Sequence, residues 1–128
     1  MTSLSPIVLL VEGDIFVRHP LAEYLRECGF TVFEAANDDE AKQALKAESG
    51  IEIVLVDIET AGGGFALRQW IKERNPPVEV ILAGSVEKAL QRAGDLCNDG
   101  PALAKPYGHI LVRDHILQAL ARRDRSKR

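Results

Sequence analysis

Short apolar runs recur along this chain at intervals of 21 to 26 residues, and stretches with helical periodicity separate them. The runs occupy residues 7–11, 31–35, 52–56, 78–82 and 102–104. Strands that alternate with helices in this way are joined by right-handed crossovers into a parallel sheet. We therefore predict an α/β fold: a three-layer α/β/α sandwich around a five-stranded parallel sheet.

Capping and stop signals place helices between these runs. The first helix ends at Gly29, and Asn37 or Asp38 caps the second. The third helix ends before Asn75-Pro76-Pro77. Ser85 caps the fourth helix, which covers 86–95, and the last helix covers about 107–122. Proline lacks an amide hydrogen, so we expect the first helix to begin near Val17 or Arg18, with Pro20 in its first turn. Five such units are typical of flavodoxin-like folds, whose strand order is 2-1-3-4-5.

Size and composition indicate a single domain over 1–128, with a core over about 6–122 and a basic tail over 123–128. The net charge of -3 disfavours nucleic-acid binding by the body of the fold. No stretch approaches the roughly 18 apolar residues that cross a membrane, and no secretion signal precedes the first run, so we expect a cytoplasmic protein. Cys28 and Cys97 lack CxxC spacing and histidine partners, which favours two free thiols over a metal site or redox pair.

Charged residues directly follow three of the apolar runs. Glu12 follows the run 7–11, Asp57 follows the third run, and Lys105 follows the last. The carboxyl ends of parallel strands meet at one edge of the sheet, and ligands bind in the crevice there. We therefore predict that these three side chains converge into one pocket.

The chemistry of this set favours phosphoryl transfer. Carboxylates gathered in one crevice repel each other unless a cation joins them, and Mg²⁺ takes one or two carboxylates together with a phosphate. An aspartate beside such a metal can accept a phosphoryl group, because the metal and a lysine neutralise the transferred charge. Each residue alone has a plainer interpretation, as a helix cap or a surface turn. Their occurrence at three matched strand ends favours one shared site.

The segments Ile7–Asp14, Ile53–Glu59 and Ala102–Tyr107, in this order and spacing, resemble the receiver domain of bacterial two-component response regulators. The resemblance extends over the predicted core, nearly the whole chain. It implies that a sensor histidine kinase or a histidine phosphotransfer protein donates a phosphoryl group to Asp57. It also implies Mg²⁺ in the acidic pocket and contact between Lys105 and the phosphoryl group. The last two helices and the last strand would form the surface for a downstream protein, and the last two helices a possible homodimer contact.

The chain departs from this family at the metal site. Receivers usually carry two adjacent acids after the first strand; here Glu12 matches the first, Gly13 replaces the second, and Asp14 is displaced by one residue. We expect Glu12 and Asp57 to bind the metal, and leave open whether Asp14 or a water replaces the missing ligand. Loss of a residue that only hydrogen-bonds to a metal ligand already weakens metal binding by about 10–100-fold. Loss of a ligand itself should cost at least as much, so we predict weak Mg²⁺ affinity.

The segment after Asp57 also differs from the family pattern, being slightly shorter and without its proline. Glu59 lies where the family binds the metal through a backbone carbonyl, which does not depend on the side chain. The three glycines at 62–64 are not followed by Gly-Lys-Ser/Thr, so they do not indicate a nucleotide-binding loop. We expect a flexible loop over the acidic pocket.

Both switch positions of the family are degenerate. Ala83 ends the fourth run, where receivers have Ser or Thr, and Ala102 stands where they have Tyr or Phe. A hydroxyl bonded to a phosphoryl oxygen is worth about 1.5–3 kcal/mol, and Ala83 cannot form that bond. Ser85, two positions on, would share the strand face of Ala83 if the strand continued.

These features favour a single-domain response regulator that accepts a phosphoryl group on Asp57 in a phosphorelay and is not itself an enzyme. Gly13, Ala83 and Ala102, which depart from the family pattern, favour an alternative: an atypical receiver that binds protein partners independently of phosphorylation. A third possibility, a Mg²⁺-dependent phosphohydrolase, would need Glu59 as its second acid, and the chain has no cap domain to hold a substrate.

Overall fold

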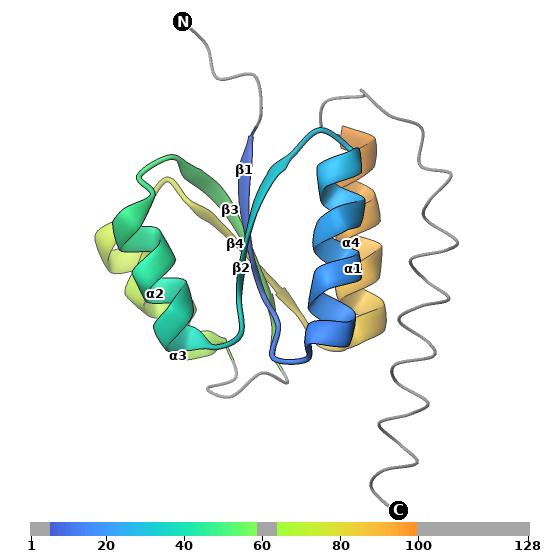
Figure 1. Ribbon diagram of the computed structural model, residues 1–128. Coiled ribbons are helices and arrows are strands. Elements are labelled where there is room, and N and C mark those ends of the chain that lie inside the picture. Colours follow the sequence, from blue (N-terminus) through green and yellow to red (C-terminus); the bar gives the residue numbers. More distant parts are fainter. Residues whose placement is uncertain (1–5, 59–63, 100–128) are drawn as a thin grey trace, which may run out of the picture.

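The computed structural model describes residues 6–58 and 64–99, and all statements below concern these residues. They form a parallel sheet covered by helices on both faces (Figure 1). The elements are β1 (Ile7–Val11), α1 (Ile15–Glu27), β2 (Thr31–Ala35), α2 (Asp38–Ala47), β3 (Ile51–Asp57), α3 (Phe65–Arg74), β4 (Glu79–Ala83) and α4 (Val86–Asp99). None of these helices is long and apolar enough to cross a membrane.

The described strands are ordered β2-β1-β3-β4, and every neighbouring pair is parallel. This confirms the predicted order for the first four strands and the α/β class. The expected fifth strand at 102–104 and the expected helix at 107–122 lie outside the described residues. The sheet as described therefore has four strands rather than five.

The central strands are mostly apolar because both faces of the sheet are buried, and the exposed Glu52 lies near the start of β3. In β1, Val8 and Leu10 pack toward α1 and α4, whereas Leu9 and Val11 pack toward α2 and α3. Successive side chains of a strand point to opposite faces, so each strand contributes to both halves of the core. Where β1 ends, the next residue is Glu12, which is also buried.

The start of α1 differs from the sequence expectation. The helix begins at Ile15 rather than near Val17, because the carboxylate of Asp14 accepts a hydrogen bond from the Phe16 amide and caps it. Pro20 therefore lies in the second turn, where it cannot donate to the Phe16 carbonyl. Burial of the Val17 side chain and of later apolar residues on the same face holds the helix on the sheet despite this lost bond.

Helix α4 lies beside α1, on the face opposite α2 and α3 (Figure 1). Ser85 caps it, as predicted, and it extends to Asp99, four residues beyond the expected end. A right-handed crossover toward a strand beyond β4 would instead place this helix on the face of α3. The apolar face of α4 packs against the α1 side of the core through Ala89, Leu90 and Ala93.

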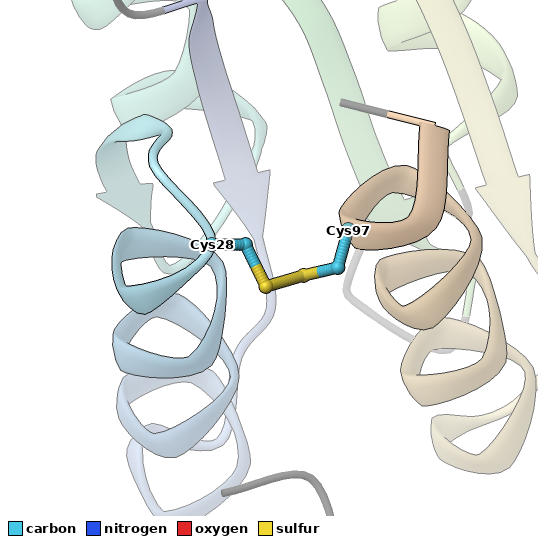
Figure 2. Close-up of a disulfide and its surroundings, with 2 residues drawn as sticks. All are labelled: Cys28 and Cys97. Atoms are coloured by element: carbon cyan, nitrogen blue, oxygen red, sulfur yellow. A yellow bond between two sulfur atoms is a disulfide. The ribbon is translucent and has the colours of Figure 1, made fainter. Parts of the chain in front are cut away.

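A disulfide joins Cys28, at the end of α1, to Cys97 of α4 (Figure 2). The two Cα atoms are 5.4 Å apart, within the range that a disulfide spans. The prediction of two free thiols is therefore wrong. Local spacing gave no signal because 69 residues separate the two cysteines along the chain.

Candidate functional site

Glu12 and Asp57 lie side by side at the carboxyl edge of the sheet. Each follows or ends a central strand, and the parallel register pairs Val11 of β1 with Val56 of β3 immediately before them. Both acids are 3% exposed, and they are the buried charged residues among those described. The predicted convergence of these two residues is therefore confirmed.

The carboxyl group of Glu12 accepts a backbone hydrogen bond on one side and lies against the Asp57 carboxyl group. Its Oε2 accepts a hydrogen bond of 2.8 Å from the Asp14 amide, while its Oε1 is buried without a hydrogen-bond partner among the described residues. Burial, followed by hydrogen bonding to the Asp57 side chain, raises the pKa of Glu12 from 4.5 to about 8, although the Asp14 amide acts in the opposite direction. Burial and the neighbouring carboxyl groups therefore dominate the electrostatics of Glu12.

Two buried carboxylates with an unpartnered oxygen fit a small divalent cation, because Mg²⁺ prefers oxygen ligands of this kind. The described residues contain no group of three His, Cys, Asp or Glu side chains that could hold a metal. The donor set from this part of the chain is therefore Glu12 and Asp57, and further ligands would have to come from backbone or water.

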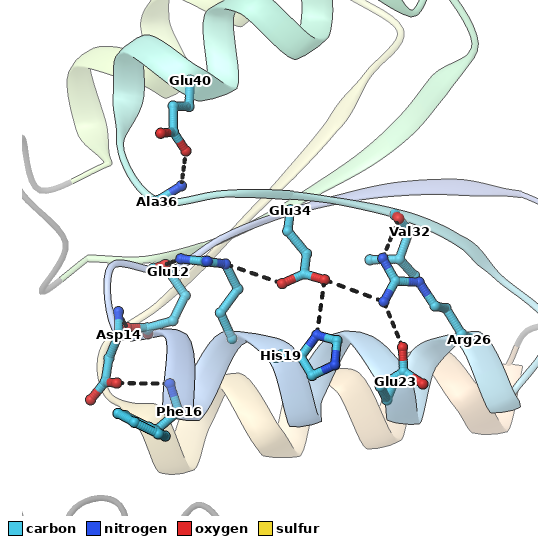
Figure 3. A network of polar contacts seen from close by, with 11 residues as sticks. Glu12, Asp14, Phe16, His19, Glu23, Arg26, Val32, Glu34, Ala36 and Glu40 are labelled. Atoms are coloured by element: carbon cyan, nitrogen blue, oxygen red, sulfur yellow. Dashed lines mark hydrogen bonds and ion pairs between the residues drawn. The ribbon is translucent and has the colours of Figure 1, made fainter.

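Asp14 is engaged elsewhere in this structure. Its side chain accepts the 2.9 Å hydrogen bond from Phe16 that caps α1, and its amide binds Glu12 (Figure 3). A direct role for Asp14 as a third metal ligand would use its other carboxylate oxygen or require Oδ1 to leave the cap. That role stays a prediction.

Gly13, between the two acids, lies in an exposed turn. A Cβ added there would meet the Ala36 carbonyl oxygen at 3.5 Å, which is an ordinary contact. The backbone at Gly13 does not adopt the left-handed conformation that only glycine tolerates well. Nothing in the backbone therefore demands glycine at this position, and the missing second acid is a difference in chemistry rather than in fold.

The degenerate switch position lies directly beside the acceptor. Ala83 pairs with Asp57 in the register of β3 and β4, and its carbonyl accepts a 2.9 Å hydrogen bond from the Ile58 amide. The hydroxyl of Ser85 accepts a 3.1 Å hydrogen bond from the Lys88 amide at the start of α4. Ser85 thus serves as a helix cap here, and a contact between its hydroxyl and a phosphoryl group stays a prediction.

Gly64 anchors the loop that follows β3. Its φ of 79° is left-handed, and an added Cβ would lie 3.0 Å from Val56 Cγ1 and 3.3 Å from Leu82 Cδ2. A side chain would therefore be strained by the backbone conformation and tightly packed against Val56 and Leu82. Of the three consecutive glycines noted in the sequence, this one fixes where α3 begins rather than supplying flexibility.

Three of the predicted site residues lie outside the described part of the chain: Lys105, Ala102 and Glu59. The contact between Lys105 and the phosphoryl group, and the metal contact of the Glu59 carbonyl, therefore stay predictions. The described structure establishes the acidic half of the predicted pocket.

A polar network on the α1 side of the sheet was not predicted from the sequence. Glu34, near the end of β2, forms ion pairs with Arg18 and Arg26 of α1 and a hydrogen bond with the His19 ring (Figure 3). Burial raises the pKa of Glu34, but the hydrogen bonds from Arg18 and His19 outweigh it and hold that pKa below its ordinary value. An acidic residue inside an otherwise apolar strand was the signal that would have located this network.

Large apolar side chains are exposed near the same edge of the sheet. Ile15 and Phe16, at the start of α1, are 55% and 63% exposed, and Phe65, at the start of α3, is 62% exposed. Both helix starts follow strands that end at the acidic edge. The three exposed residues therefore form an apolar rim at the same edge of the sheet as the two acids.

No protein-family model matches the chain. It is 29% identical over 123 residues to a cyclic di-GMP phosphodiesterase of Thermotoga maritima, an alignment that covers 91% of this chain and 31% of that relative. It is 31% identical over 130 residues to the C4-dicarboxylate transport transcriptional regulatory protein DctD of Rhizobium meliloti, covering 98% of this chain and 27% of that protein. The chain thus spans less than a third of either relative.

Solved structures with the same fold are receiver domains or response regulators. The non-phosphorylated HemR receiver domain of Leptospira biflexa is 25% identical, with a TM-score of 0.57 over 89% of this chain and 93% of that one. A response regulator from Thermotoga maritima is 24% identical, with a TM-score of 0.58 over 92% and 99%. A co-crystal of the Saccharomyces cerevisiae histidine phosphotransfer protein Ypd1 with the Ssk1 receiver domain matches at a TM-score of 0.55 and 20% identity, over 83% and 82%.

The fold, the paired acids at the ends of β1 and β3, and the similarity to response regulators agree with one another. Similarity to the sequence of one curated regulator extends over almost the whole chain. The chain is a receiver domain of the kind found in two-component response regulators.

Proposed function

We propose that this receiver domain accepts a phosphoryl group on Asp57 from a phosphohistidine of a sensor histidine kinase or a histidine phosphotransfer protein. One observation carries the proposal: Glu12 and Asp57 are buried together, and Glu12 Oε1 has no partner among the described residues. A buried acid pair of this kind is costly unless positive charge completes it. Such an arrangement suits a site that handles a cation and an anionic group.

In the proposed transfer, a carboxylate oxygen of Asp57 attacks phosphorus. The phosphorus–nitrogen bond to the donor histidine breaks, and its electron pair stays on the imidazole nitrogen. Mg²⁺, when bound, supplies positive charge that offsets the phosphoryl oxygens and the carboxylates. Glu12 and Asp57 would hold it, together with the backbone carbonyl of Glu59. Lys105 is proposed to contact the phosphoryl oxygens as a positive point charge.

The affinity for Mg²⁺ is proposed to be weak. Glu12 and Asp57 supply two carboxylates, Gly13 supplies none, and the Asp14 carboxylate caps α1. At neutral pH the raised pKa of Glu12 also means that a proton must leave before the metal binds. Both effects reduce the apparent affinity.

The proposed donor docks over the apolar rim formed by Ile15, Phe16 and Phe65. Exposed aromatic and branched side chains next to a buried acceptor can contact the apolar face of a helix that presents the phosphohistidine. The similarity to a receiver crystallised with a histidine phosphotransfer protein supports a partner of this class. Phe16→Ala should then slow transfer from a protein donor, but not from a small phosphodonor.

The proposal is tested by incubating the protein with phosphoramidate and Mg²⁺ and measuring its intact mass. We expect the mass of one phosphoryl group to be added to the wild type and not to Asp57→Asn. The exposed α2 residue Asp39 provides the matched control, because Asp39→Asn removes the same charge away from the pocket. Wild-type protein that gains no phosphoryl mass over a range of Mg²⁺ concentrations would overturn the proposal.

A second function, phosphorylation-independent binding of a protein partner, is favoured by the alanine beside the acceptor. Ala83 offers no hydroxyl that could sense a phosphoryl group on Asp57. In that case Asp57→Ala would leave the affinity for the partner unchanged. Loss of partner binding or of biological output in this variant would rule the second function out.

The remaining assignments are also proposals. The domain itself is proposed not to be an enzyme, to bind a downstream protein rather than nucleic acid or membrane, and to act in the cytoplasm. The surface for the downstream protein and for a homodimer was predicted on the last two helices, of which the final one lies outside the described residues. The disulfide between Cys28 and Cys97 argues against the proposed cytoplasmic location, because a reducing cytoplasm disfavours such bonds.

A further inference from the structure

The turn that carries the acidic site has an exposed glycine at its centre. Glu12, Gly13 and Asp14 connect β1 to α1, and within this turn the Asp14 amide donates a hydrogen bond to Glu12 Oε2. Glycine allows many backbone conformations, so contacts with the backbone of Glu12 help to fix the orientation of the Glu12–Gly13 peptide.

Arg18, one turn into α1, provides that support. Its Nη1 donates a 3.0 Å hydrogen bond to the backbone carbonyl of Glu12, while its Nε donates a 3.1 Å bond to Glu34 Oε1. The Arg18 side chain is 14% exposed, so water competes little for these acceptors. The other side of the Glu12 backbone is held by its amide, which donates to the Ala35 carbonyl at 2.9 Å.

Glu34 keeps the Arg18 side chain in place. It projects from β2 and is itself held by Arg26 at 3.2 Å and His19 at 3.4 Å (Figure 3). A carboxylate fixed by several cations forms a rigid anchor, and the planar guanidinium of Arg18 can donate from Nε and Nη1 at once. A lysine has one nitrogen at this place and cannot reach both acceptors with the same geometry.

We infer that Arg18 is a positioning residue of the acidic site: it fixes the carbonyl of Glu12 against Glu34 and thereby sets where the Glu12 carboxylate points. This inference rests on the proposed function of the Glu12–Asp57 pocket. It adds a residue that touches neither the metal nor the phosphoryl group. Residues that orient a metal ligand typically change metal affinity by about 10–100-fold when they are removed.

Arg26 is a matched control within the same helix. It also pairs with Glu34, and its Nη2 also donates to a backbone carbonyl, that of Val32, at 2.8 Å. That carbonyl lies within β2 rather than in the turn beside the acids. Each of the two substitutions therefore removes an ion pair with Glu34 and a hydrogen bond to a backbone carbonyl. The carbonyl bonded by Arg18 belongs to Glu12 of the pocket, whereas the carbonyl bonded by Arg26 does not.

The test compares wild type, Arg18→Ala, Arg18→Lys and Arg26→Ala. Titration with Mg²⁺, followed by NMR, should give an affinity at least tenfold lower for both Arg18 variants and close to wild type for Arg26→Ala. In metal-free protein, the Asp14 amide should exchange its hydrogen at least tenfold faster in the Arg18 variants, because its bond to Glu12 is loosened. Urea unfolding checks that each variant is folded.

Equal Mg²⁺ affinities and equal Asp14 exchange rates in Arg18→Ala and Arg26→Ala would overturn the inference. The exchange readout needs neither metal nor phosphoryl transfer. If wild-type protein accepts no phosphoryl group but the Asp14 amide still depends selectively on Arg18, the proposed function fails while the positioning role stands. If phosphoryl transfer occurs at the same rate and with the same Mg²⁺ dependence in all four proteins, the positioning role fails while the function stands.

Discussion

Replacing Gly13 with aspartate should restore the second acid of the metal site. The structure has room for it: an added Cβ would contact the Ala36 carbonyl oxygen at 3.5 Å, and the backbone is not left-handed. The new carboxylate would follow Glu12 directly, in the turn at the acidic edge of the sheet. The variant therefore changes the charge of the pocket without a change of fold.

The added carboxylate is expected to stabilise the metal-bound protein and to destabilise the metal-free protein. A third carboxylate ligand should raise Mg²⁺ affinity at least tenfold, equivalent to about 1.4 kcal/mol. Without metal, unit charges about 6 Å apart repel by roughly 3 kcal/mol at an effective dielectric constant of about 20, and solvent at the exposed turn reduces this toward ~1 kcal/mol. Gly13→Asp should thus be less stable than wild type in EDTA and gain more from Mg²⁺.

The assay is calorimetric titration with Mg²⁺, together with thermal unfolding in EDTA and in excess MgCl₂. Gly13→Asn is the matched control, because it has the same shape as the aspartate without its charge. We expect Gly13→Asn to bind Mg²⁺ about as weakly as wild type. Equal affinities for Gly13→Asp and Gly13→Asn would refute the claim that a missing carboxylate limits metal binding.

Three further predictions follow from the described contacts. Without metal, the free energy of unfolding should fall as pH rises from 4.5 toward 8, by up to about 1.4 kcal/mol per unit, because folded Glu12 keeps a proton that the unfolded chain has released. Urea titrations should show this slope and its loss in Glu12→Gln; an equal slope in that variant would contradict the assignment. Reducing the Cys28–Cys97 bond, or Cys28→Ser, should lower the free energy of unfolding by about 4 kcal/mol, since the bond closes a loop of 69 residues; identical urea midpoints with and without reductant would show that it does not form. Ala83→Ser should tighten binding of beryllium fluoride at Asp57 by roughly tenfold or more in a fluorine NMR titration, through one added hydroxyl bond, and no change would place the added hydroxyl out of reach.

Much of the fold was predictable because burial on both faces gives each central strand a long apolar run. The bounds of β1 and β2 match the runs 7–11 and 31–35, and the order of the first four strands agrees with the expected topology. The pairing of Glu12 with Asp57 was predictable for the same reason, since parallel strands bring their carboxyl ends to one edge.

The features that escaped prediction depend on contacts between residues far apart in the sequence. The apolar stripe of α4 suits either face of the sheet, so periodicity alone did not indicate that it lies beside α1. The disulfide between Cys28 and Cys97 depends on that placement. The support of Glu12 by Arg18 depends on Glu34, which belongs to another element.

The start of α1 shows a competition between two local signals. Pro20 favours a helix that begins late, but the Asp14 side chain bonds the Phe16 amide and starts the helix at Ile15. A cap is worth about 1 kcal/mol, and the packing of the buried face adds to it. The low helix propensity of Pro20 therefore did not decide where α1 begins.

We propose that Lys105 joins the described Glu12–Asp57 pair in one phosphoryl-binding pocket. The most direct test is a crystal structure of the protein with beryllium fluoride and Mg²⁺. We expect the fluoride complex on the Asp57 carboxylate, the metal between Asp57 and Glu12, and the Lys105 ammonium against the fluorine atoms. A structure in which the complex binds elsewhere, or in which Lys105 lies far from Asp57, would contradict the account.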